Sequence, residues 1–128
     1  MKKLDNYTLA EVSSISQAEL ESRALLRTAS TLFQIKEHWE EKKGELNEAL
    51  EKNRKLWTIL SSYANEEDGP QPMDIRQNIT NLALFIFKKT LDIMLHPAPE
   101  SLDILININR TIAKGLSAGA QTENHENK

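Results

Sequence analysis

Apolar side chains recur at helical spacing along four stretches of the chain. In the first, Ser16 and Glu19 form a capping box, in which the serine side chain bonds an exposed amide at the start of a helix. An apolar stripe follows, at intervals of three and four residues, and continues to Trp39. This pattern predicts a first helix from residue 16 to about residue 41.

A second stripe predicts a helix that begins at Leu46 and ends near Tyr63. Residues 42–44, Lys-Lys-Gly, interrupt the pattern before it and favour a turn. The segment NEEDGPQP, residues 65–72, follows the second helix. It is predicted to be a loop, because a proline inside a helix loses a hydrogen bond and clashes with the preceding turn.

The third stretch, from Met73 to His96, is apolar on nearly every side of the predicted helix. Such a helix is either a central one, covered by several neighbours, or one whose spare face belongs to a partner. Pro97 and Pro99 end it, since the residue before a proline is disfavoured in the helical conformation.

The fourth stripe begins after Ser101, a candidate cap, and is predicted to stop near Gly115 to Gly119, because glycine commonly ends helices. The polar residues beyond have little to bury and are expected to be mobile. No stretch alternates strictly between apolar and polar residues, so no strand is predicted. The expected fold is all-α: an antiparallel bundle of about four helices in a single domain over residues 1–116, with a disordered, mobile carboxy-terminal tail over 117–128.

An Asn-Arg pair interrupts the apolar stripe of both the second and the fourth helix. At about 100° per residue, Asn53 and Asn109 fall within their stripes, whereas Arg54 and Arg110 fall toward the edges. A buried amide without a partner costs about 1–3 kcal/mol, so each must find a hydrogen bond. Two interpretations remain open: the amides fix the register of the helices, or they bond a partner helix in a groove.

The charge of the chain argues against nucleic acid as a partner. The 128 residues carry a formal net charge of −3, which gives no overall positive field for a phosphate backbone. The local basic cluster, between residues 42 and 55, is interspersed with glutamates and is typical of a solvated helix face. Direct contact with nucleic acid is therefore not expected.

The sequence favours a soluble protein of the cytoplasm. There is no cysteine, which fits a reducing compartment, and no apolar run of signal-peptide length at the amino terminus. The apolar run LALFIF, residues 82–87, is followed by Lys88 and Lys89, far short of the roughly 20 residues that cross a bilayer. No membrane association is expected.

Catalytic and metal-binding patterns are missing. His38, His96 and His125 lack metal-ligand spacing, and the sequence holds no glycine-rich phosphate loop. Adjacent carboxylates, such as Glu40 and Glu41, lie in charged stretches that are usually solvated. We therefore expect a protein that is not an enzyme and that has no catalytic residue, metal or cofactor.

Three segments together carry a resemblance to a known family. In order they are ESRALLRTASTL, LNEALEKNRKLWTIL and ININRTIAKGL, and the resemblance spans about Tyr7 to Leu116. This ordered set resembles the FlaF family of bacterial flagellar biosynthesis proteins. The resemblance implies a small, helical, non-enzymatic protein that acts on flagellin as a dedicated chaperone supporting its synthesis and export.

The expected partner is unassembled flagellin, bound through its terminal amphipathic helices. The candidate contact residues combine the Asn-Arg motifs with neighbouring apolar anchors: Asn53, Arg54, Leu56, Trp57, Phe85, Phe87, Asn109 and Arg110. Ordinary core packing is the alternative for the aromatic side chains among them. The alternative function is regulation of flagellin translation, through protein contacts with the regulator FlbT or on flagellin mRNA.

Overall fold

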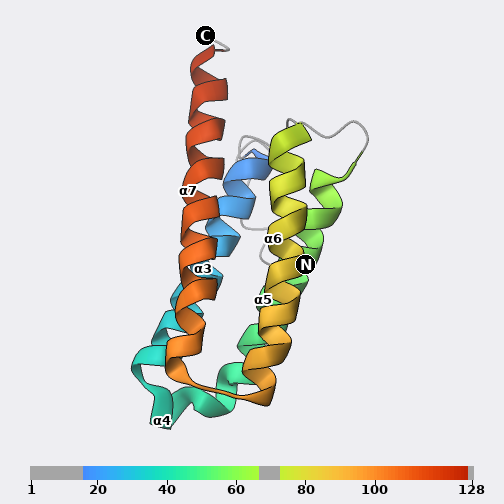
Figure 1. Cartoon of the computed structure of the whole chain (residues 1–128). Helices are drawn as coiled ribbons and strands as arrows, with labels where there is room; N and C mark the ends of the chain where they lie inside the picture. Colours follow the sequence, from blue (N-terminus) through green and yellow to red (C-terminus); the bar gives the residue numbers. More distant parts are fainter. Residues whose placement is uncertain (1–15, 67–72, 127–128) are drawn as a thin grey trace, which may run out of the picture.

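The computed structural model describes residues 16–66 and 73–126, with side chains for all of these except 75 and 120–126. Four long helices run up and down in turn: α3 (Gln17–Glu37), α5 (Leu46–Ala64), α6 (Met73–Leu95) and α7 (Asp103–Glu126). They form an antiparallel bundle (Figure 1), and the described residues contain no strand. The predicted all-α fold is confirmed.

The first helix begins as predicted but ends earlier. Ser16 caps α3, because its Oγ accepts a hydrogen bond of 3.1 Å from the Glu19 amide. At His38 the backbone leaves the helical region, with φ −120° and ψ 48°. A short helix, α4 (Trp39–Lys42), then crosses the end of the bundle (Figure 1). The prediction of one helix to about residue 41 was wrong, and no glycine or proline marks the break.

The turn between the first two long helices lies where the pattern placed it. The 3₁₀ helix η1 (Lys43–Glu45) contains Gly44 and leads directly into α5. The second helix, predicted from Leu46 to near Tyr63, is confirmed to within one residue. The predicted loop lies mostly outside the described residues, because the structure describes only 65 and 66 of it.

The third helix matches its predicted bounds, whereas both ends of the fourth differ. The 3₁₀ helix η2 (Pro99–Leu102) precedes α7, and Ser101 lies inside it rather than capping α7. At its other end α7 continues through Gly115 and Gly119 to Glu126, so the predicted stop was wrong. Neither glycine has a positive φ, and a glycine inside a helix costs only about 1 kcal/mol. The division into a domain over 1–116 and a tail beyond it stays a prediction.

The helices do not pack equally on all sides. Helix α3 packs closely against both α7 and α5, and α5 packs against α6, but α6 approaches α7 at few positions or none. The side of the bundle between α6 and α7 is therefore its most open side. Helix α6 is not a central helix, as one interpretation of its sequence supposed; it has a spare face.

The core lies between α3, α5 and α7 and continues along one face of α6. Its fully buried large side chains are Leu25, Leu32, Ile35, Leu50, Trp57, Leu60, Ile86, Ile93, Leu102 and Leu105. Polar contacts between described residues join α3 to α7: the buried Ser22 Oγ donates to the Ala113 carbonyl at 2.7 Å, and Lys36 Nζ lies 2.7 Å from Asp103 Oδ1. The second is part-exposed, and the nearby carboxylate raises the pKa of Lys36.

None of the helices, over the described residues, has a stretch both long and apolar enough to cross a membrane.

Candidate functional site

Three of the predicted site residues form one buried polar chain across the bundle. Trp57 Nε1 donates to Asn109 Oδ1 at 2.9 Å, and Asn109 Nδ2 donates to Asn53 Oδ1 at 2.8 Å. All three side chains are fully buried. Because α5 and α7 have few close contacts otherwise, this chain links two helices that face each other diagonally. The sequence placed both amides in the core, and the structure shows that they bond each other.

This buried chain fits the interpretation that the amides fix helix register. Its side chains have no exposed surface and therefore offer none to a partner in this conformation. Within the described residues, Asn53 Nδ2 and the buried Thr90 Oγ1 have no hydrogen-bond partner. A role of Asn53, Trp57 and Asn109 as direct partner contacts stays a prediction.

The two arginines lie apart from each other. Arg54 forms a two-pronged hydrogen bond with Glu51 on α5, at 2.7 Å from Nε and 3.1 Å from Nη2. The arginine lowers the pKa of Glu51, and the carboxylate raises the pKa of Arg54. On α7, the Arg110 guanidinium lies 5.3 Å from the centre of the Phe33 ring on α3, in cation–π geometry.

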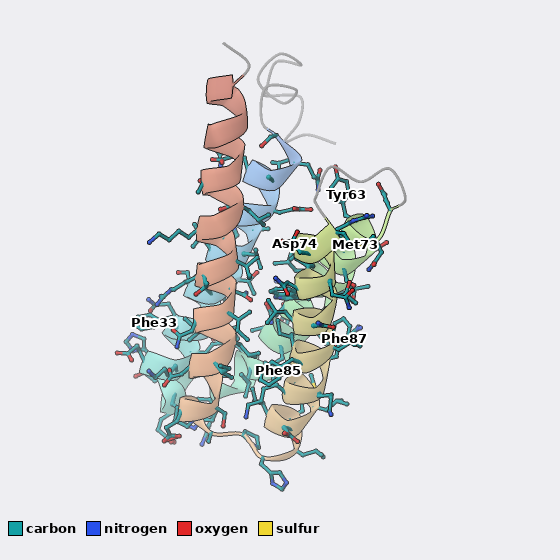
Figure 2. All side chains as sticks on the ribbon, turned by 45° about the horizontal axis from the view of Figure 1, so that its top comes forward. Phe33, Tyr63, Met73, Asp74, Phe85 and Phe87 are labelled. Atoms are coloured by element: carbon teal, nitrogen blue, oxygen red, sulfur yellow. The ribbon has the colours of Figure 1, made fainter. Side chains whose placement is uncertain are left out.

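The two phenylalanines of α6 project to opposite sides of that helix (Figure 2). They are two residues apart and so differ by about 200° around the axis. Phe85, 43% exposed, lies on the side nearer α7, whereas Phe87 is half-buried, as is Leu56 on α5. The eight predicted residues therefore do not share one surface.

The open side of the bundle contains an apolar groove between α6 and α7. Its volume is about 190 Å³, and it is lined by Leu82, Asn107, Ile108, Thr111 and Ile112. We call it the α6–α7 groove. Ile108 and Ile112 lie on either side of Asn109 in the sequence, so the groove runs beside the buried polar chain.

Exposed apolar side chains extend this surface on both helices. Ile104, one turn before Ile108 on α7, is 39% exposed, and Phe85 lies three residues after Leu82 on α6. Ile108 and Ile112 belong to the apolar stripe of the fourth predicted helix, and they pack against the core as well as lining the groove. The signal that could have placed them at the groove is the four-residue spacing of Ile104, Ile108 and Ile112, a second apolar line on α7.

A second hollow, of about 210 Å³, lies between α3 and α5, and most of the residues that line it are polar or charged. Its lining residues are Arg27, Thr28, Thr31, Glu45, Glu48, Ala49 and Lys52. Lys52 Nζ lies 3.4 Å from Glu48 Oε1, and both side chains are well exposed. This is a solvated charge pair of the kind that the sequence predicted for this segment. Among the described residues, no cluster of histidine and acidic side chains could hold a metal ion.

Comparison with known families identifies the chain. The family model described as flagellar protein FlaF matches residues 4–116, which is most of the sequence. The chain belongs to the FlaF family. The resemblance carried by the Asn-Arg segments is thereby confirmed, and this FlaF-family protein is a flagellar protein.

Neither the curated proteins nor the solved structures contain a match to this FlaF-family chain. The matched region covers α3 to the first part of α7, including both Asn-Arg pairs and both walls of the α6–α7 groove.

Proposed function

We propose that this protein is a non-enzymatic cytoplasmic chaperone, which binds unassembled flagellin in the α6–α7 groove and supports its synthesis and export. Membership of the FlaF family supports a flagellar role. The chaperone proposal rests on the groove itself: one side of the four-helix bundle is open, and the surface of the groove there is mostly apolar.

An amphipathic helix is the occupant that suits this groove. Flagellin's terminal segments are amphipathic helices whose apolar stripes are covered only in the filament, so they need cover before export. A helix that lies between α6 and α7 buries its apolar stripe on Leu82, Ile108 and Ile112. Phe85 and Ile104, both partly exposed, extend the contact as anchors.

The test is calorimetry or pull-down with purified flagellin and with flagellin that lacks its terminal helices. We expect binding of the complete flagellin, loss of binding without the helices, and at least tenfold weaker binding by Ile108→Glu, since a charge in an apolar interface is strongly unfavourable. Ile59→Glu is the matched control. Ile59 is an exposed apolar residue of α5, outside the groove, and should leave affinity unchanged.

Three results would overturn the proposal. Wild-type affinity in a folded Ile108→Glu variant would remove the groove from the site. Binding to FlbT but to no flagellin would favour the alternative, a regulator of flagellin translation that acts through protein contacts. Binding to flagellin mRNA alone would favour the other form of that alternative, although the basic side chains Arg54 and Lys52 already pair with glutamates.

A further inference from the structure

The outer face of α6, directed away from the core, carries an apolar stripe distinct from the α6–α7 groove. Leu84, Leu91 and Leu95 are 57%, 62% and 73% exposed. With Lys88 they recur at intervals of four, three and four residues, which is the spacing of a seam between two paired helices. We call these four residues the α6 seam.

This face of α6 also carries two charged side chains of opposite sign. Lys88 and Asp92 are one turn apart and exposed, and neither side chain has an ion pair or hydrogen bond within the described part of the chain. A surface that carries a cation and an anion one turn apart is complementary to itself. A twofold axis can place each charge opposite the other charge of a second copy.

We propose that the protein self-associates through the α6 seam, as an antiparallel pair of α6 helices related by a twofold axis near residue 90. Lys88 of each copy then faces Asp92 of the other. Leu84 and Leu95 lie six and five residues from residue 90, on either side of it, so Leu84 of one copy meets Leu95 of the second. Leu91, beside the axis, meets its own counterpart.

Charge decides between the two orientations of the pair. In a parallel pair Lys88 would face Lys88, and Asp92 would face Asp92, so both contacts would repel. The antiparallel pair replaces them with two attractive contacts, and a charged residue within an apolar seam is known to set register and orientation. Because one helix pair makes a small interface, we expect a dissociation constant on the order of 10–100 μM.

Sedimentation equilibrium of the full chain over a range of concentrations tests the association. We expect a monomer–dimer equilibrium that Leu91→Glu abolishes and that the control Ile59→Glu leaves unchanged. A wild-type protein that stays monomeric up to about 500 μM, or a folded Leu91→Glu variant that still dimerises normally, would overturn the proposal.

A charge-exchange series tests the orientation independently. Lys88→Asp and Asp92→Lys should each weaken the dimer about tenfold, because each creates two like-charge contacts. The double variant K88D/D92K should recover the wild-type dissociation constant. Failure of the double variant to recover would overturn the antiparallel arrangement. Self-association does not depend on flagellin binding, so flagellin binding and self-association can fail separately.

Discussion

At the residue scale, the buried chain Trp57–Asn109–Asn53 explains why two amides interrupt apolar stripes. Asn109 uses its oxygen and its nitrogen at once, accepting from Trp57 and donating to Asn53. Leucine at the same position would leave the indole N–H and the Asn53 oxygen without partners in the core. Two other buried groups, the Trp57 indole N–H and the Asn53 side-chain oxygen, therefore require an amide at residue 109 as their hydrogen-bond partner.

Asn109→Ala should lower the free energy of unfolding by about 2–4 kcal/mol, since it leaves two buried polar groups unpaired and a small cavity. Urea denaturation followed by far-UV circular dichroism measures this. Asn107→Ala, an exposed asparagine two residues earlier, is the control and should change stability by less than about 0.5 kcal/mol. Equal effects of the two substitutions would contradict the role of the buried chain.

Glu21 gives the fold a predictable dependence on pH. Its side chain is buried on α3, and this burial raises its pKa above the ordinary value of 4.5, although a hydrogen bond from Gln17 opposes the shift. Between 4.5 and the higher folded-state pKa the native protein binds more protons than the unfolded chain. The contribution of Glu21 to stability therefore falls as pH rises through that window.

Glu21→Gln should accordingly raise the free energy of unfolding at pH 7, and the gain should shrink below pH 4.5, where the carboxyl is protonated in both states. Urea denaturation at a series of pH values checks the sign. Glu37→Gln, at an exposed position of the same helix, is the control. A Glu21→Gln variant less stable than wild type at pH 7 would show that the charged form is the favoured one.

At the element scale, α6 and α7 show that residue types alone do not determine where a helix ends or which neighbours cover it. The glycines of α7 suggested an end, yet the helix continues because nothing after Gly115 forbids it. The apolar character of α6 fitted either a central or a partly uncovered helix. The packing of α6 against α5, with few or no close contacts to α7, shows that α6 is partly uncovered.

Gly115→Ala should raise the free energy of unfolding by about 0.5–1 kcal/mol, because alanine favours the helix and a methyl group at this position meets no neighbouring atom within 4 Å. Thermal or urea denaturation measures the gain. The reverse change nearby, Lys114→Gly at an exposed position, should lower stability by about 1 kcal/mol. Destabilisation by Gly115→Ala would mean that α7 bends or ends at this residue.

At the scale of the whole molecule, the main feature is an unequal bundle. Three of its sides are closed by helix packing, and the side between α6 and α7 is open enough to hold a groove. Adjacent residues of α6 lie in different surroundings: Leu82 lines the groove, whereas Ala83 is buried in the core.

Enlarging these two side chains should therefore change the free energy of unfolding by different amounts. Leu82→Phe projects into the groove and should change the free energy of unfolding by less than about 1 kcal/mol while weakening flagellin binding. Ala83→Leu overpacks the core and should cost about 1–3 kcal/mol. Urea denaturation of both variants, with calorimetry against flagellin for Leu82→Phe, measures these effects. Equal destabilisation would show that the groove is closed in solution.

The sequence by itself determined the helical fold, the start of α3, the bounds of α5 and α6, the family and the burial of Asn53 and Asn109. Each of these follows from the periodicity of apolar residues, from a helix cap, or from motif residues in a fixed order, all of which can be found in the sequence without knowing the distances between helices. Tertiary structure decided the break at His38, the pairing of the two amides, the separation of Arg54 from Arg110, and the open side beside α6. These depend on distances between helices far apart in the chain, and a repeating apolar pattern shows which face a helix buries but not which neighbour covers it.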